Sequence, residues 1–467
     1  MPYLCMVMGC LMEKYRSYMP HQNRYLNYNK LSIYRYFREI KLYNYLYLNM
    51  NLLAIGICVA VWSTAYTKVS YHGFKMYAVT PKSRLQLQLL QGMHTESKTN
   101  VVDFWVPPRG VNIPVQISLP PQSKLAATFR LIGMEVKLVM HDVQQYIDTQ
   151  NRVDLSFTPK RKMEEFNYAE YHNLSAINDW ITNITTVYSS ITKVIEVGTS
   201  YEGRIIRLIK IDTGKVQQKN GFFMEGGIHA REWIAPATVI YMTGQMLDMY
   251  GKDPKITDIV DSYTWYILPV FNVDGYEYTW TTDRNWRKTR SKHGSCYGVD
   301  PNRNWDWEWC KEGATKDPCT DTYCGPSAFS EVEVKAVADY ISMQKGTIKA
   351  FIDFHSYSQL WMTPWGYTKK LPTDYADQDA GAKAACDALE VDYGTKYQHG
   401  SIANIIYVAS GSSADWTYGA EKIKYSYGVE LRDTGKYGFL LPADQIVPSG
   451  KETLEGLKAL CTYVFHH

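Results

Sequence analysis

No clear membrane-spanning segment is present in the 467-residue chain. The one stretch that resembles a membrane signal, Leu52–Trp62, has only eleven residues, whereas a spanning helix needs about 20. Its length fits the apolar region of a secretory signal peptide, with small residues at Ser63 and Ala65 for the peptidase. A start at Met50 would make residues 1–49 a doubtful leader, an artefact of the gene model. A buried core helix is the alternative for the apolar stretch.

The chain also lacks an excess of charge of either sign. Lys and Arg number 50 and Asp and Glu 47, a net charge of +3. A nucleic-acid-binding protein would show a basic excess, so we expect no nucleic-acid partner. The composition, 45% hydrophobic and 21% charged, is that of an average soluble protein and excludes a mostly disordered or fibrous chain. The length suits two or three domains.

Paired CxxC spacings, which would support a structural zinc site, are absent. Without Cys5, Cys10 and Cys58 of the leader and signal, six cysteines remain, and four of them fall within 29 positions. Such a cluster is typical of disulfides in an oxidising compartment. We therefore expect a secreted, extracellular protein. Two sequons, beginning at Asn173 and Asn183, are compatible with glycosylation.

The first part of the mature chain is predicted to be a small α+β domain of the β-α-β-β-α-β, ferredoxin-like kind. Its strands and helices are expected at Lys75–Val79, Ser83–Gly92, Val101–Val106, Val115–Ser118, Ser123–Ile132 and Glu135–Met140. A basic linker, Thr158–Lys162, follows without apolar spacing. It is either a solvated hinge or a cleavage site for a trypsin-like protease, and we favour cleavage.

From Phe166 onward the pattern becomes α/β, which predicts a mixed, twisted sheet with helices on both faces. Strands are expected at Arg204–Ile211, Gly221–Glu225, Trp265–Val270, Ala350–His355 and Tyr425–Leu431. Helices are expected at Ala235–Tyr250, Glu331–Lys345, Tyr375–Tyr393 and Glu452–Phe465.

A histidine and a glutamate, His229 and Glu232, stand three residues apart between a predicted strand and a predicted helix. One helical turn would bring both toward one ion. Catalytic zinc usually has three protein ligands, so the third should come from another strand end, where His355 is the best candidate. Taken alone, the pair is a weak signal, because a histidine beside a glutamate is often an ordinary surface pair.

Further motifs change the weight of that pair. The motifs HAREW, WRKTRS, DPNRNW, FHSYSQ, IYVASG and ELRDTG follow one another in this order. Together they resemble the zinc metallocarboxypeptidases of the pancreatic carboxypeptidase A/B type. The resemblance covers nearly everything from Tyr66 onward, including the small domain, which is similar to their activation segment. After the signal peptide predicted at 50–65, it implies an activation domain at 66–161 and a catalytic domain at 162–467.

The resemblance implies a role for each matched residue. His229, Glu232 and His355 match the ligands of one zinc ion per chain. Glu430 matches the general base, which takes a proton from the attacking water and delivers it to the leaving amine. Arg287 matches the residue that stabilises the oxyanion beside the ion.

Other matched residues would hold the peptide substrate. Asn302 and Arg303 match the pair that binds the free terminal carboxylate. A guanidinium suits a carboxylate because it can donate two parallel hydrogen bonds. This would make the enzyme an exopeptidase acting on peptide and protein C-termini. The remaining contacts implied along the groove are a mobile tyrosine and three further side chains: Tyr407, Arg231, Tyr357 and Phe439.

The resemblance also implies two disulfides, Cys296–Cys319 and, as in the carboxypeptidase B branch, Cys310–Cys324. Cys386 and Cys461 have no counterpart in the family and either pair or remain free.

Specificity in this family is read near an Asp-Trp pair, here Asp415-Trp416. The branch that removes Lys and Arg carries an extra aspartate just before the pair, where this chain has Ala414. The other matched pocket residues are uncharged, and we expect a preference for aromatic or aliphatic C-terminal residues: Met362, Ile402, Ser412 and Gly428. The segment is one residue longer than the family pattern, so a nearby acid such as Glu421 leaves a carboxypeptidase B-like preference as the alternative.

Two other readings compete with this one. A catalytically inactive secreted binding protein on the same fold would have lost a zinc ligand or the general base, but all four residues are present. A prohormone-processing relative would lack the activation segment. We therefore expect a monomeric zymogen that a trypsin-like protease activates.

Overall fold

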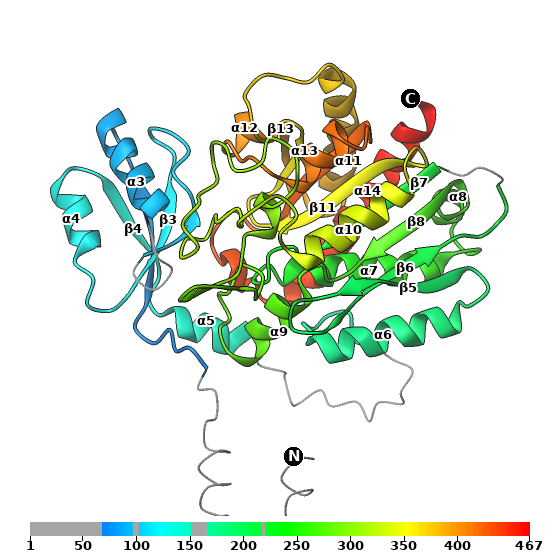
Figure 1. Cartoon of the computed structure of the whole chain (residues 1–467), viewed down its shortest axis with the longest axis horizontal. Coiled ribbons are helices and arrows are strands. Elements are labelled where there is room, and N and C mark those ends of the chain that lie inside the picture. The colour runs from blue at the N-terminus through cyan, green and yellow to red at the C-terminus, as the bar shows by residue number, and fades with distance from the viewer. Residues whose placement is uncertain (1–67, 97–101, 151–165, 217–219) are drawn as a thin grey trace, which may run out of the picture. The chain divides into compact units, whose positions relative to one another are not determined.

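The computed structural model describes residues 68–96, 102–150, 166–216 and 220–467 (Figure 1). The predicted leader, the signal peptide and the basic linker at Lys160–Lys162 lie outside the described residues. Among the residues that are described, no helix is long and apolar enough to cross a membrane.

The small domain forms an antiparallel four-stranded sheet of order β2-β3-β1-β4, as the ferredoxin-like pattern predicts. Its elements are β1 (Lys75–Thr80), α3 (Arg84–Glu96), β2 (Asp103–Val106), β3 (Val115–Leu119), α4 (Leu125–Leu131), β4 (Glu135–Met140) and α5 (Val143–Gln150). Two predictions were wrong in detail. Helix α3 does not end at Gly92 but runs on to Glu96, and α5 was not predicted.

Both faces of this small sheet are covered. Helices α3 and α4 place Leu90 and Phe129 on one face, against Val115 and Ile117 of β3. The other face carries Met76 and Trp105, which pack with α5 and with side chains of the large domain. As a result, β3 is buried along its whole length, because side chains pack against it from both faces of the sheet.

The large domain is built on an eight-stranded mixed sheet of order β13-β12-β14-β11-β7-β8-β6-β5 (Figure 1). The central strands β14, β11, β7 and β8 are parallel to one another, whereas β6 and β5 are antiparallel to their neighbours. The strands are β5 (Thr192–Thr199), β6 (Ile205–Ile211), β7 (Asn220–Gly226), β8 (Tyr263–Leu268), β11 (Ile348–Ser356), β12 (Leu360–Thr363), β13 (Gln398–Ser401) and β14 (Tyr425–Leu431).

Helices cover both faces of this sheet, as predicted. The larger helices are α6 (Leu174–Val187), α7 (Ile234–Met249), α10 (Val332–Met343), α11 (Tyr375–Tyr393) and α14 (Ile446–His466). Short helices and hairpin strands connect them: α8 (Pro254–Ser262), α9 (Val273–Thr281), β9 (Lys292–His293), β10 (Cys296–Tyr297), η2 (Pro301–Arg303), α12 (Ile402–Ile405), α13 (Ser413–Gly419), η3 (Gly438–Leu440) and η4 (Ala443–Gln445).

The alternation of side chains along the strands shows which helix covers which face. Tyr263 of β8 donates to a carbonyl of α14, and Tyr427 of β14 donates to a carbonyl of α11, so these helices share one face. Tyr266 points the other way and meets Tyr340 of α10. Asp353 and His355 of β11 point to this second face, where Ser413 of α13 contacts Asp353. The functional side chains therefore lie on the face that α10 and α13 cover.

Candidate active site

The predicted site residues gather where parallel strands end. The carboxyl ends of β7, β11 and β14 meet at one edge of the sheet. His229 and Glu232 follow β7, His355 lies near the end of β11, and Glu430 lies near the end of β14. His229 and Glu232 lie in the turn between β7 and α7, which agrees with their predicted place between a strand and a helix.

The predicted ligand atoms converge closely. One ligand atom from each of His229, Glu232 and His355 lies within 4.8 Å of the other two, and all three residues are buried. His229 Nδ1 is 2.8 Å from one Glu232 oxygen, and His355 Nδ1 is 3.0 Å from the other. The two Nδ1 atoms are 3.1 Å apart. Two imidazole nitrogens and one carboxylate oxygen are the donor set of a catalytic zinc site with an open position, so these residues fit that ion.

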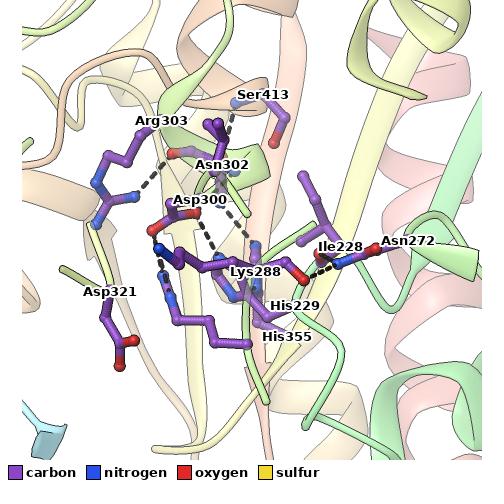
Figure 2. Close-up of polar contacts among 12 residues, drawn as sticks. Ile228, His229, Asn272, Lys288, Asp300, Asn302, Arg303, Asp321, His355 and Ser413 are labelled. Atoms are coloured by element: carbon purple, nitrogen blue, oxygen red, sulfur yellow. Dashed lines mark hydrogen bonds and ion pairs between the residues drawn. The ribbon is translucent and has the colours of Figure 1, made fainter. Parts of the chain in front are cut away.

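Each of these histidines turns its second ring nitrogen to a buried aspartate. His229 Nε2 is 3.2 Å from Asp300 Oδ1, and His355 Nε2 is 3.0 Å from Asp353 Oδ2. Figure 2 shows the first of these contacts. The sequence analysis gave neither aspartate a role. For Asp353 the available signal was an acid inside the apolar stretch Phe351–Phe354, because a buried carboxylate needs a partner.

Glu430 presents an unused oxygen to the site. Its Oε2 is buried and has no hydrogen-bond partner among the described residues. Burial raises the pKa of Glu430 to about 8, with His355 opposing and Glu232 reinforcing the shift. A carboxylate whose oxygen is free of protein donors can accept a proton from a bound reactant.

Arg287 lies beside the ligand set. Its Nη2 donates to Asp300 Oδ2 at 2.8 Å, and its Nη1 is 3.8 Å from Glu232 Oε1. Burial alone would raise the pKa of Asp300, but the charges of Arg287, Arg303 and His229 outweigh it and hold this pKa well below its usual range. Asp300 is thus a carboxylate that fixes both Arg287 and His229.

The 3₁₀ turn η2 presents the predicted carboxylate-binding pair. Asn302 accepts from Ser413 N through Oδ1 at 2.9 Å and turns Nδ2 toward His355 (Figure 2). Arg303 is held by the carbonyls of Asn302 and Gly313, at 2.8 and 2.9 Å. The Tyr407 ring lies 5.9 Å from the Arg303 guanidinium. The predicted pair and the predicted mobile tyrosine therefore border one space.

That space is a cavity in the surface of the large domain. Neither Glu232 nor Arg287 lines it, but two predicted ligands, the predicted base and the predicted substrate-binding and pocket residues do: His229, His355, Glu430, Asn302, Arg303, Tyr407, Met362, Ile402, Ser412, Ala414 and Gly428, together with Ile406, Ala409 and Ser413. Glu421 does not line it. That acid accepts from Ser342 of α10 at 2.8 Å and lies 3.5 Å from Lys345.

Three predicted groove residues are in contact with the small domain. Asp103 Oδ1 is 3.2 Å from Arg231 Nη1. Tyr357 donates to Gln116 Oε1 at 2.6 Å, and the ring centroids of Trp105 and Phe439 are 5.1 Å apart. The small domain thus covers the groove beside the cavity.

The structure forms both disulfides that the resemblance implied, Cys296–Cys319 and Cys310–Cys324. They cross-link the long loop that carries Asn302 and Arg303. Cys386 and Cys461 are free and buried.

Comparison with known proteins agrees with this geometry. Residues 177–456 match the zinc carboxypeptidase family, and residues 77–150 match the carboxypeptidase activation peptide. The chain is 48% identical over 300 residues to carboxypeptidase B of Astacus astacus, an alignment that covers 64% of this chain and 98% of that protein. It is 38% identical to carboxypeptidase A2 of Mus musculus, over 88% of this chain and 98% of the relative. A crystal structure of thrombin activatable fibrinolysis inhibitor (TAFI) matches with a TM-score of 0.78 at 35% identity, over 85% of this chain and all of that one.

Proposed function

Because the chain belongs to the zinc carboxypeptidase family and carries its activation peptide, we propose that it is a secreted zymogen whose cavity removes single residues from peptide C-termini. The observation that carries the proposal is the convergence of His229, Glu232 and His355 next to a cavity in which both histidines lie beside Glu430 and Arg303. We assign residues 50–65 to the signal peptide, 66–161 to the activation domain and 162–467 to the catalytic domain.

When bound by His229, Glu232 and His355, zinc supplies Lewis-acid polarisation of the scissile carbonyl and lowers the pKa of a water molecule. Glu430 accepts the proton of the attacking water on its free oxygen and passes it to the leaving amine. The Arg287 guanidinium, fixed by Asp300, stabilises the negative charge that develops on the carbonyl oxygen.

Asn302 and Arg303 explain why the reaction is confined to the chain end. Arg303 is buried, and its carbonyl partners engage Nε and Nη1 and leave Nη2 for the substrate. A terminal carboxylate bound there places only the last peptide bond beside the ligand set. An internal peptide bond has no such carboxylate, so Arg303 cannot hold it in this position.

The activation domain inhibits by occupying the groove upstream of the cavity. Three side chains proposed to contact the substrate are bound by this domain instead. Asp103 pairs with Arg231, Gln116 accepts from Tyr357, and Trp105 packs against Phe439. None of these three activation-domain residues lines the cavity itself. Removal of the domain by a trypsin-like protease would free the groove.

We expect limited trypsin to cut the zymogen near Lys160–Lys162 and to raise its activity on peptide substrates strongly. Trp105→Ala should raise the activity of the uncut protein, because the indole packs against Phe439. Leu131→Ala, at a position of the same domain that is 87% exposed, is the control and should change nothing. Activity on peptide substrates is measured before and after cleavage. Full activity in the uncut wild type would contradict inhibition by this domain.

The pocket that receives the C-terminal side chain favours aromatic or aliphatic residues. Its apolar walls come from Met362, Ile402, Ile406 and Ala414. Burying one large apolar side chain there is worth roughly 1.5–3 kcal/mol. Two acids behind the pocket wall accept hydrogen bonds from the protein. Asp415 accepts from the backbone N–H groups of Gly366 and Tyr367, and Asp353 accepts from Ser413.

Removal of Lys or Arg is the second candidate. The 48% identity to a carboxypeptidase B favours this candidate. So does the buried Asp353, which lies behind Ser413, because Asp353 Oδ1 has no partner among the described residues. On the activated enzyme we expect hippuryl-Phe to be cleaved faster than hippuryl-Arg. Ala414→Asp should reverse this preference, because it places a carboxylate in the pocket wall. Faster cleavage of hippuryl-Arg by the wild type would overturn the preference and leave the zinc chemistry intact.

A further inference from the structure

We propose that Asp353 is a positioning residue for the zinc site: its carboxylate accepts the His355 Nε2–H and holds Nδ1 toward the ion. The inference rests on the proposed ligand set of His229, Glu232 and His355. Asp353 is fully buried in the central strand β11, two residues before His355 and on the same face of the sheet. The distance from Asp353 Oδ2 to His355 Nε2 is 3.0 Å.

The tautomer of His355 makes Asp353 necessary. Its Nδ1 lies against Glu232 Oε2 and His229 Nδ1, so Nδ1 is the ligand atom and the ring proton belongs on Nε2. Asn302 Nδ2 is also near, at 3.1 Å from Nε2. That group is a donor, because Asn302 Oδ1 already accepts from Ser413 N, which fixes the orientation of the amide. Asp353 is therefore the acceptor for the Nε2 proton.

Asp353 is itself held rigidly. It pairs with Glu225 of β7 on one side and with Gly428 of β14 on the other, in the middle of the sheet. Ser413 Oγ donates to Asp353 Oδ2 at 2.8 Å from the first turn of α13. A carboxylate fixed by a strand and a helix turn can determine the ring orientation of a histidine more precisely than a loop residue can.

Asp300, the aspartate that contacts His229, has two basic partners. Asp300 divides its carboxylate between His229 and Arg287. Within the described part of the chain, His355 is the only basic group within ion-pair distance of Asp353. The Asp353 carboxylate is therefore not shared with a second basic side chain, and it serves His355 as a hydrogen-bond partner of the kind that orients a metal ligand.

Zinc retention tests the proposal on the full-length zymogen. We expect Asp353→Ala to weaken zinc binding by about 10- to 100-fold, the usual effect of losing such a partner. Asp353→Asn should lose less, because the amide oxygen can still accept from Nε2 although the charge is gone. Zinc affinity and dissociation are measured by competition with a chromophoric chelator. Thermal unfolding of the metal-free proteins checks that each variant is folded.

Glu225→Gln is the matched control. Glu225 lies opposite Asp353 on β7, is equally buried, and makes no hydrogen bond to a ligand residue. The same acid-to-amide change there should lower zinc affinity far less than either Asp353 variant does, because no ligand residue loses a hydrogen bond.

Two results would overturn the proposal. One is wild-type zinc retention in both folded Asp353 variants. The other is unchanged zinc retention with a lowered ratio of hippuryl-Arg to hippuryl-Phe cleavage, which would assign Asp353 to substrate recognition. If Asp353→Ala does not fold, the near-isosteric Asp353→Asn decides the question. A wild-type protein that binds no zinc would refute the ligand set instead, so the two failures are distinguishable.

Discussion

Glu430→Gln should reduce turnover by about 10²- to 10⁴-fold, the usual contribution of a general base, while leaving peptide binding measurable. The amide keeps the size of the side chain but cannot take up the proton of the attacking water. Among the described residues, Glu430 Oε2 has no hydrogen-bond partner that would compensate for the loss. Because Glu430 is not among the predicted metal ligands, the variant should keep its zinc.

The measurements are turnover on a blocked dipeptide, binding of a substrate-like inhibitor, and zinc content of the activated variant. Glu421→Gln is the matched control, since Glu421 belongs to the same part of the chain but is bound to Ser342 and Lys345 outside the cavity. It should retain wild-type turnover. A Glu430→Gln variant within tenfold of the wild type would refute the assignment of the base.

Chelation of the metal should abolish activity, and added zinc should restore it. A catalytic zinc ion contributes several kcal/mol of transition-state stabilisation. A loss of about 4 kcal/mol lowers the rate about a thousandfold. No described side chain can replace it, because the three ligand residues offer only acceptor atoms toward the centre. Phenanthroline treatment of the activated enzyme, followed by titration with zinc, measures both steps.

The same treatment should lower the thermal stability of the catalytic domain. A ligand that binds only the folded state stabilises it, and without the ion the buried His229, Glu232 and His355 are left close together without a common partner. Thermal unfolding is compared before and after removal and after zinc is returned. Activity that persisted in verified metal-free protein would contradict the proposed chemistry.

The sequence by itself determined the elements whose patterns are local. β4, β14 and α11 have the predicted boundaries, because alternation and helical spacing are properties of neighbouring residues. The prediction of α14 began at Glu452, whereas the helix begins at Ile446. β8 begins at Tyr263 and ends at Leu268, not at Val270. Ends of elements depend on tertiary contacts that spacing does not record.

The family motifs likewise marked His229, Glu232, His355 and Glu430, because each motif keeps its residues within a few positions of one another. The short strands β12 and β13 were not predicted. They are four residues each, and their pairing with β14 and with each other depends on partners distant in the chain.

Only the tertiary structure decided what surrounds these residues. Asp353 is an ordinary acid in the printed sequence, and its role arises because β11 points it to the same face as His355 and α13 brings Ser413 against it. Trp105 and Phe439 are more than three hundred positions apart, yet their rings meet over the groove. Contacts of this kind join separate elements, and a pattern of neighbouring residues carries no information about the distances between them.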